Sequence, residues 1–496
     1  MYKTHVIKPN FVSKNSILKK NANLSPARHN YVQTNSNIDY LVDLIEESKA
    51  SINVRNNKGR YSYVEIGDIN TNTGGIDYKE VRSIDISSSS VNKLKKDDIL
   101  ISTVRTYLGG IGYVNKELQN LVATKALIVL RKTKKDFSRF YLFGVLRSRF
   151  FIEQVNLILN ASVYPRMEKD NFSELKIPFP TKNNNPEPKK IENLISLITQ
   201  NILDKEEQIK LKNQKIDELI EKELKDNQKV GTFEFRLPKI SEIRNETRID
   251  TGLYEKKYRE IVYLIDDYKN SHFDLLEKYT AKRGQNLQIT NIGLSIYSDV
   301  EKPNFYRLMT NIELTDQRTV SKFRWLGSGK KLTLIPKNTI FLSADGTVGR
   351  CMYITDLGKT ITNIHPWIIN RKKIGVNQIE DIFTAMFLGW LYKKGFYEKV
   401  KDKANGGGIK YNHLERYLKI PNFPESKQKE VAKEYYNPTE QSSDLNFENY
   451  LGKEKARNAE TGIFQLNMEL FSLREKLEDF VDKIVKEEKV NISFEY

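Results

Sequence analysis

The sequence has 496 residues, of which 39% are hydrophobic and 29% charged; this fits about three or four globular units and excludes collagenous or wholly disordered chains. One cysteine, Cys351, and five histidines without ligand spacing exclude an internal disulfide and a cysteine-rich zinc site, so we expect no metal and a reducing, cytoplasmic setting. The net charge of +17 favours an anionic partner.

The N-terminal residues lead into a polar stretch without the apolar core of a signal peptide, so none is expected. The most apolar window, Phe383 to Tyr392, has ten residues and is too short to span a bilayer. It predicts a buried helix, and we expect no membrane partner.

The excess positive charge is confined to two windows. Residues 51–150 carry +9 and residues 301–400 carry +8, which together equal the net charge. Clustered Lys and Arg attract the phosphates of nucleic acid, so the windows predict two basic nucleic-acid-binding modules. The alternative is that the basic charge only aids solubility, which would not require its confinement to two windows.

In the first basic window, short β-type runs precede a helical pattern. The expected strands are Tyr61 to Ile66, Ile99 to Val104 and Ala126 to Leu130, and the expected helix is Phe140 to Leu157. Glycine pairs at 74–75 and 109–110 mark turns between them. The mixture predicts an α+β domain.

A long helix with heptad character follows the first window. One seam has Ile195, Ile202, Ile209 and Ile216 seven residues apart; the other has Ile191, Ile198 and Leu219, interrupted by Lys205 and Lys212. A narrow seam flanked by charged positions needs a helical partner, which predicts a coiled coil. The alternative is an amphipathic helix packed on a globular core.

The second half repeats the order of the first. KDDILIS (Lys96 to Ser102) corresponds to KNTIFLS (Lys337 to Ser343) at an offset of 241, and LKIP (Leu175 to Pro178) corresponds to Leu418 to Pro421 at an offset of 243. Strands are expected at Thr339 to Ser343 and Trp367 to Asn370, and a helix at Ile379 to Val400. We infer an internal duplication, with α+β domains alternating with long helices.

The helical region is repeated as well. Lys215 to Lys222 matches Lys476 to Lys483 in residue class at an offset of 261, so the second half carries 18 extra residues between Pro438 and about Asn458, predicted as a loop or short accessory element. An unbroken 3-4 alternation is formed by Ile463, Leu466, Leu470, Leu473, Leu477, Phe480 and Ile484. The nearest helical partner for each seam is the other copy.

Catalytic motifs are missing from the sequence. There is no phosphate loop, serine nucleophile elbow or zinc-protease helix motif. The closest string to an amino-methyltransferase loop, Asn437-Pro438-Thr439-Glu440, lacks the second proline and the aromatic residue. We expect no catalytic residue in this chain.

The loops around the glycine turns and before the LKIP motifs carry the candidate DNA contacts. They are Arg105, Thr106, Tyr107, Lys125, Tyr164 and Arg166 in the first half and Asp345, Thr347, Arg350, Lys410 and Tyr411 in the second. Arg and Lys address guanine edges, Asp addresses cytosine, and aromatic rings beside cations suit nucleic acid. The alternative is that the glycines only shape turns, the tyrosines are core and the cations are solvated.

Several motifs in a fixed order resemble the specificity (S) subunit of type I restriction-modification systems. They are YVEIGDI (Tyr63 to Ile69) followed by Gly75-Ile76, KKDDILIS, PKNTIFLS, the paired LKIP strings and the helical repeats. The resemblance covers nearly the whole chain. The second copy lacks a clear counterpart of YVEIGDI, and Tyr306 to Glu313 is its best candidate.

The resemblance implies two target recognition domains alternating with two long helices that pair as an antiparallel coiled coil. The implied boundaries are 1–186 and 231–434 for the recognition domains, 187–230 and 461–496 for the helices, and 435–460 for an inserted loop or linker. Helix pairing and subunit docking are expected at Ile195, Ile202, Ile209, Ile216, Ile463, Leu470, Leu477 and Ile484.

The resemblance also implies the partners: double-stranded DNA, two methyltransferase (M) subunits and restriction (R) subunits. S-adenosylmethionine, ATP and Mg²⁺ would be bound by the partner subunits, and this chain would hold no cofactor. Because the two modules differ strongly between their motifs, we expect an asymmetric, bipartite target. The alternatives are a coiled-coil scaffold without DNA reading, or the S-type chain of a combined methyltransferase-nuclease.

Overall fold

The computed structural model describes residues 5–15, 29–104, 106–159, 166–167, 169–246, 251–372, 377–402 and 407–496. The chain divides into two units. The first unit comprises Tyr2–Glu207, Glu440–Ala459 and Met468–Tyr496, and the second comprises Gln208–Thr439 and Glu460–Asn467. The division therefore falls inside two long helices, and each unit combines one α+β module with helical segments.

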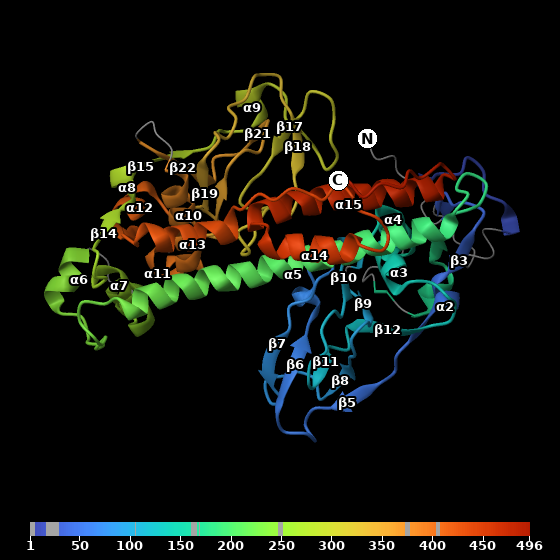
Figure 1. Ribbon diagram of the computed structural model, residues 1–496, viewed down its shortest axis with the longest axis horizontal. Helices are drawn as coiled ribbons and strands as arrows, with labels where there is room; N and C mark the ends of the chain where they lie inside the picture. Colours follow the sequence, from blue (N-terminus) through green and yellow to red (C-terminus); the bar gives the residue numbers. More distant parts are fainter. Residues whose placement is uncertain are drawn as a thin grey trace. The chain divides into compact units, whose positions relative to one another are not determined.

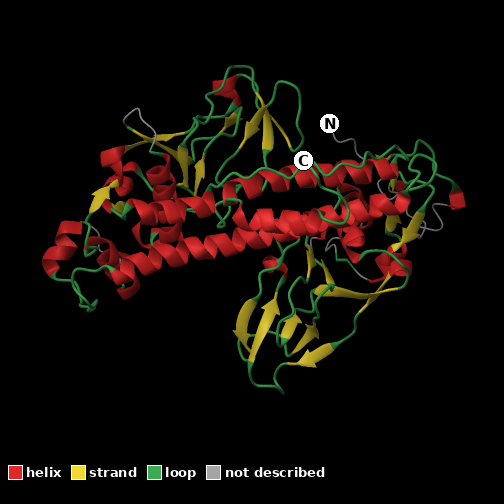
Figure 2. Ribbon diagram, in the orientation of Figure 1, coloured by secondary structure: helices red, strands yellow, loops and turns green. Residues whose placement is uncertain are grey.

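Module one, residues 38–178, is built on two sheets (Figures 1 and 2). The four-stranded antiparallel sheet has the order β10 (Ile111–Tyr113), β9 (Ile99–Ser102), β12 (Leu127–Thr133), β4 (Ile45–Glu47). The five-stranded sheet has the order β5 (Ser51–Asn53), β8 (Ser90–Lys93), β11 (Leu121–Ala123), β6 (Arg60–Val64), β7 (Lys79–Arg82), with β11 and β6 parallel. Apolar residues of both sheets, such as Val64 and Leu100, form one core cluster.

Further short elements complete module one. They are β3 (Ile38–Tyr40), which pairs with β13 (Lys176–Pro178), α2 (Leu41–Leu44), η2 (Ile66–Asp68), η3 (Thr106–Leu108) and η4 (Lys169–Ser173). Outside the module, β1 (Val6–Ile7) pairs with β2 (Tyr31–Val32).

The single helix expected at Phe140 to Leu157 is two helices, α3 (Arg139–Leu146) and α4 (Arg149–Leu159). Ser148 lies between them. Its hydroxyl donates to the carbonyl of Val145 (2.6 Å) and accepts the N–H of Phe151 (3.4 Å). A serine that bonds the backbone in this way favours a helix start, and so the chain begins a new helix here.

Module two, residues 272–421, repeats the topology of the four-stranded sheet of module one and the parallel strand pair of its second sheet, but the outer strands of that second sheet differ. Its first sheet has the order β15 (Tyr279–Arg283), β22 (Pro366–Arg371), β19 (Thr339–Ser343), β20 (Cys351–Ile354). Its second sheet has the order β16 (Ile296–Ser298), β18 (Arg324–Gly327), β17 (Tyr306–Leu308), β21 (Thr360–Ile361), with β17 and β21 parallel. The pair β14 (His272–Asp274) and β23 (Lys419–Pro421) repeats β3 and β13.

The helices of the second unit are short apart from α10. They are α6 (Ile240–Glu246), η5 (Thr251–Tyr254), α7 (Lys256–Asp266), α8 (Leu275–Lys278), α9 (Ile289–Ile292), α10 (Gln378–Lys393), α11 (Tyr397–Val400), α12 (Tyr411–Tyr417) and α13 (Glu425–Tyr435). Helix α10 contains the most apolar window of the sequence, and that window is largely buried, as expected. Within the described residues, no helix is long and apolar enough to cross a membrane.

The duplication extends to individual side chains. Before β9, Asp97 has a positive φ of 69° and accepts the hydroxyl of Tyr113; before β19, Asn338 has a φ of 54° and accepts the hydroxyl of Tyr353. Asp and Asn tolerate this left-handed conformation better than other non-glycine residues do. The same turn thus starts the central strand in both modules, which confirms two modules of one fold.

The best candidate for the second copy of YVEIGDI also lies in the matching place. In module one, the backbone N–H of Glu65 donates to Asp68, three residues on, and Lys79 at the start of β7 pairs with that carboxylate. In module two, the N–H of Thr310 donates to Glu313 and Arg324 at the start of β18 pairs with it at 2.8 Å. Tyr306 to Glu313 is therefore the structural counterpart.

The long helix predicted from the heptads is α5 (Pro188–Asp226), which has 39 residues and a length of about 60 Å. The second predicted helix is α15 (Ile463–Val485), with 23 residues. All eight predicted seam residues are buried: Ile195, Ile202, Ile209, Ile216, Ile463, Leu470, Leu477 and Ile484. Their burial within the chain suits helix packing rather than a docking surface open to another subunit.

Contacts inside the first unit give the direction of the helices. Asn185, just before α5, accepts the N–H of Val490, just after α15, and Lys205 pairs with Glu469 at 2.6 Å. As residue numbers increase along α5, the residue numbers of their partners along α15 decrease, so these segments are antiparallel. Continuous coiled-coil packing along both helices stays a prediction.

The 18-residue insertion contains a helix, α14 (Tyr450–Glu460). It lies in the first unit, where Asn458 accepts a hydrogen bond from Lys205 at 2.6 Å and Glu454 accepts one from Asn201 at 3.0 Å. Lys205, which interrupts the seam in sequence, is completely buried. The insertion therefore supplies polar partners for a buried lysine.

Candidate nucleic-acid interface

The loops expected to contact DNA gather at one end of the four-stranded sheet in each module. In module two, the loop after β19, the start of β22, the end of β15 and the segment before α12 meet there. The backbone N–H of Ile409 donates to the carbonyl of Ala344, and Arg283 pairs with Trp367 across β15 and β22. We call this the loop end of the sheet.

A stacked cation and ring form the centre of the loop end in module two. The guanidinium of Arg283 lies 4.0 Å from the ring centroid of Trp367, and Tyr411 packs edge-on against that ring at 6.1 Å. The indole N–H donates to the carbonyl of Ile409 at 2.9 Å, which fixes the ring. A guanidinium stacked on an aromatic face is oriented and weakly hydrated, which suits contact with a base.

Asp345 lies beside this stack. Its carboxylate is 3.5 Å from the Arg283 guanidinium and 3.2 Å from Nδ1 of His365. Burial lowers the pKa of Arg283, and the charge of Asp345 opposes that shift. The guanidinium of Arg283 also donates to the backbone carbonyls of His365 and, at 3.1 Å, of Ile409, so it joins these loops while it stays partly exposed beside Asp345.

The other residues predicted in module two are placed differently. Thr347 is exposed in the turn after β19, and Lys410 is exposed and paired with Asp402 at 2.6 Å. Arg350 donates to the carbonyl of Leu314 at 2.8 Å and joins the turn to the segment after β17. Asp345, Lys410 and Tyr411 are therefore brought together at the loop end, whereas Arg350 has a positioning contact.

In module one, the loop end is formed by the equivalent segments. Arg166 is exposed and forms an isolated antiparallel β-bridge with Val104, which follows β9. Lys125 is exposed just before β12, and its ammonium donates to the side chain of Asn92 at 2.8 Å. Tyr107 is half-buried, and Thr106 is buried with its hydroxyl donating to the carbonyl of Ser102. Thr106 therefore shapes the loop from inside.

Two predicted residues of module one, Arg105 and Tyr164, lie outside the described residues. Arg283, Trp367 and His365 were missed as site residues by the sequence reasoning. Arg283 lies at the end of a strand that the sequence did not predict. Its position beside Trp367 follows from the strand register of the sheet, so only a prediction of that register could have identified it.

Each module is also tied to a long helix by matching residues. In the first unit, Glu206 of α5 accepts a hydrogen bond from Asn70 at 3.1 Å and one from Thr73 in the glycine loop. In the second unit, Asn467 of α15 bonds both the N–H and the carbonyl of Val320, at 2.9 and 3.0 Å. Glu206 and Asn467 are 261 residues apart, the offset of the helical repeat.

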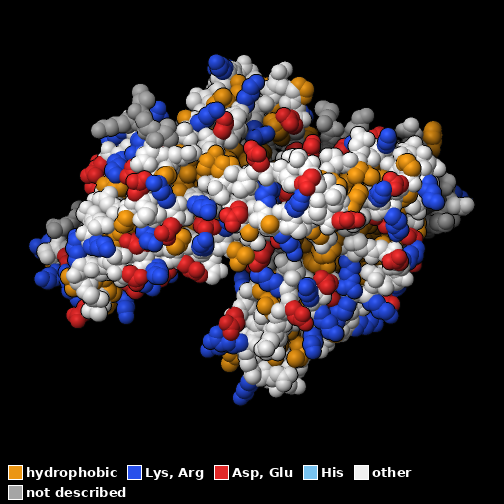
Figure 3. Space-filling view, viewed as in Figure 1, with side chains coloured by type: hydrophobic (Ala, Val, Ile, Leu, Met, Phe, Trp, Pro, Cys, Tyr) orange, Lys and Arg blue, Asp and Glu red, His pale blue; other side chains and the backbone are white. Residues whose placement is uncertain are grey.

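Lys and Arg side chains are also exposed away from the loop end. Lys132, Lys134 and Lys135 are exposed at the far end of β12, and Figure 3 shows Lys and Arg gathered over and beside this strand. Their long side chains carry no base-specific geometry, so they suit phosphate contacts. Among the described residues, no group of three or more His, Cys, Asp or Glu side chains is arranged to hold a metal ion.

Comparison with known families decides what module one is. Residues 35–220 match the family model of the type I restriction modification DNA specificity domain. Module one is a type I restriction-modification DNA specificity domain. Residues 35–220 thus carry the domain of the family that the motifs of the chain resemble.

The chain is also similar to solved structures, each at 14% identity. The S subunit of a type I restriction-modification system from M. genitalium has a TM-score of 0.45, with 93% of this chain and 97% of that chain covered. The HsdS subunit from Thermoanaerobacter tengcongensis has a TM-score of 0.29, with 90% and 96% covered. A chain from a type I R-M system described for its complex assembly has a TM-score of 0.30, with 92% and 98% covered.

All three TM-scores lie below 0.5, so these overall likenesses are loose. No curated protein sequence matches the chain.

Proposed function

We propose that this chain selects the DNA target of a cytoplasmic type I restriction-modification complex, with each module reading one half of a bipartite sequence. The observation that carries the proposal is the specificity-domain match over residues 35–220 together with the repeat of its four-stranded sheet and its parallel strand pair in module two. Because module two has the same loop end at its four-stranded sheet, we infer that it forms a second DNA-reading surface.

At the loop end of module two, Arg283 and Asp345 are the proposed base readers. A guanidinium can donate two hydrogen bonds to the guanine edge, and a carboxylate can accept from the cytosine amino group; each good bidentate contact contributes about 1–3 kcal/mol of discrimination. The stack on Trp367 would hold the guanidinium in place before DNA binds.

The target is proposed to be asymmetric because equivalent loop-end positions differ between the modules. By strand register, Arg283 corresponds to Lys49, Trp367 to Ile128, and Asp345 to Val104 after the central strand. Different side chains at matching places would recognise different bases.

Two M subunits and R subunits are the proposed protein partners, and S-adenosylmethionine, ATP and Mg²⁺ would be bound by them rather than by this chain. The proposal rests on the specificity-domain match of residues 35–220. The long helices are the proposed docking region, through faces other than the buried seams.

Genome-wide mapping of N6-methyladenine, with and without this gene, tests the proposed function. We expect loss of one bipartite, asymmetric methylated motif on deletion. An unchanged methylation pattern together with DNA affinity that is insensitive to salt would favour a scaffold instead, because six or more phosphate contacts should cost about 10³-fold in affinity between 50 and 200 mM salt.

A further inference from the structure

A four-residue motif occurs twice at the repeat offset. Thr232 to Phe235 reads TFEF, and Ser493 to Tyr496 reads SFEY, 261 residues later, the same offset that relates α5 to α15. Both segments follow their helix by a few residues. A valine shortly before each motif is also anchored, at an offset of 260: the N–H of Val230 donates to Asp267 at 2.7 Å and that of Val490 to Asn185 at 2.9 Å. They are therefore the same element of the duplicated chain.

In the first unit, a helix covers the SFEY motif. The ring centroid of Phe494 lies 5.1 Å from that of Phe447 and 5.1 Å from that of Tyr450, the first residue of α14. The hydroxyl of Tyr496 donates to Glu454 and accepts from Arg457. The covering segment thus offers two aromatic rings three residues apart, Phe447 in the turn before α14 and Tyr450 at its first position, followed by Glu454 one turn after the second ring.

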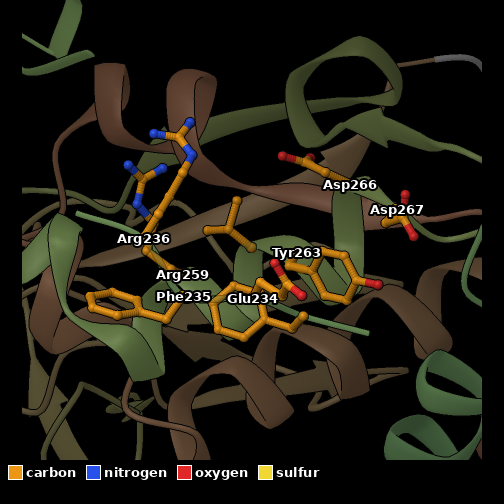
Figure 4. Close-up of a pocket in the computed structure, with 9 residues that line it drawn as sticks. Glu234, Phe235, Arg236, Arg259, Tyr263, Asp266 and Asp267 are labelled. Atoms are coloured by element: carbon orange, nitrogen blue, oxygen red, sulfur yellow. The ribbon is translucent and has the colours of Figure 1, made fainter. Parts of the chain in front are cut away.

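In the second unit, the TFEF motif lines a hollow of 340 Å³ with α7 (Figure 4). Phe233, Phe235, Val262 and Tyr263 supply its apolar surface, and the ring of Phe233 packs on Tyr263 at 5.4 Å. Phe235 is 41% exposed, and three further apolar side chains on this segment are more than 60% exposed: Val230, Leu237 and Ile240. The first repeat has no counterpart of the insertion that supplies α14.

The charge at one end of the hollow favours an acidic side chain. Arg236 and Arg259 both pair with a single carboxylate, Glu242, at 2.5 and 3.3 Å, and Figure 4 shows the two guanidinium groups side by side. Two cations that share one anion leave an excess positive charge at this end, whereas Glu234, Asp266 and Asp267 line the rest of the hollow. In the first unit, the matching motif meets the carboxylate of Glu454 through the hydroxyl of Tyr496, a group that Phe235 lacks.

We propose that the TFEF hollow is the docking site of an amphipathic helix from a partner protein. The partner would present one aromatic residue just before its helix and a second at the first helical position to Phe233 and Phe235, and a glutamate one turn further to Arg236 and Arg259. The template is residues 447–460, the turn and helix that already cover the SFEY motif of the same chain. The site goes beyond the proposed DNA reading, since Phe235 lies outside the observed module two, residues 272–421.

A peptide with the sequence of residues 444–460 is the probe, held helical by a lactam bridge because an isolated helix of this length is marginal in water. Fluorescence anisotropy of the labelled peptide is measured against the full chain. We expect saturable binding that Phe235→Ser weakens about tenfold or more, as for a buried aromatic anchor. The matched control Leu237→Ser, two residues along and outside the hollow, should bind as the unaltered chain does.

A peptide with alanine at positions 447 and 450 should lose binding, and DNA affinity should be equal for Phe235→Ser and the unaltered chain. Failure of the peptide to bind, or equal binding by Phe235→Ser, would overturn the proposal. Sedimentation that shows a dimer of the unaltered chain, lost in Phe235→Ser, would identify a second copy as the occupant and also overturn it.

Discussion

Replacement of Lys205 by methionine tests the ionic cluster between α5, α14 and α15. The ammonium of Lys205 is completely buried and lies 2.6 Å from Glu469 and 3.6 Å from Glu454. Removal of one member of a buried ion pair costs about 3–5 kcal/mol, because the remaining charge is left uncompensated. Since Arg457 also pairs with Glu469 at 2.8 Å, we expect the low end, a loss of about 3 kcal/mol in the free energy of unfolding.

Urea unfolding followed by circular dichroism measures this loss. With a slope of about 2–3 kcal/mol per molar urea, the transition of the first unit should move down by about 1 M or more. The control is Lys190→Met on the same helix, whose side chain is 51% exposed and paired with Glu187; it should change the free energy by less than about 0.5 kcal/mol.

The double variant Lys205→Met with Glu469→Met separates charge from packing. Replacement of both partners by apolar side chains removes the uncompensated charge, so the double variant should be no less stable than Lys205→Met alone. A loss below about 1 kcal/mol for Lys205→Met would refute the assignment of Lys205 as a buried, paired charge.

Three further outcomes are expected. Arg283→Ala should relax base preference in one half of the target by about 1–3 kcal/mol in a selection of bound DNA sequences; an unchanged preference would remove Arg283 from the proposed readers. Burial alone would lower the pKa of His5, but its contacts with Asp482 and Glu153 raise the pKa to about 9. The stabilisation by His5 is therefore complete below about pH 6.5 and is lost as the pH rises through 9. This pH dependence of the free energy of unfolding should be absent in His5→Asn, as measured by unfolding at a series of pH values. Ile209→Asp with Ile216→Asp should lower the thermal transition of the second unit, because each substitution places an unpaired carboxylate at a buried position of α5; an unchanged transition would contradict the burial of this seam.

The strands that the sequence predicted are the central ones. β9 and β19 are continuous apolar runs that are buried throughout, and the composition of such a run is enough to predict a buried strand. β4 and β15 were missed because they are edge strands with polar residues, and their strand character depends on pairing with β12 and β22.

The candidate site divides in the same way. Asp345 and Tyr411 were found because each lies close in sequence to a recognisable motif, Asp345 in the loop after β19 and Tyr411 at the start of α12. Arg283 was not, because its role follows from the register that sets it against Trp367. Thr106 was expected to face DNA, but a hydrogen bond to the backbone turns it inward, and only the folded loop decides that direction.

The sequence by itself determined the duplication, the two basic windows, the heptad seams and the family of module one, because order, charge and periodicity are properties of the linear chain. The tertiary structure decided which interruptions are tolerated. In the sequence, Lys205 interrupts the apolar seam of α5. In the structure, α14, about 250 residues away in sequence, brings Asn458 and Glu454 close to it. A buried charge is stable only when its partners are in place, and the fold alone puts them there.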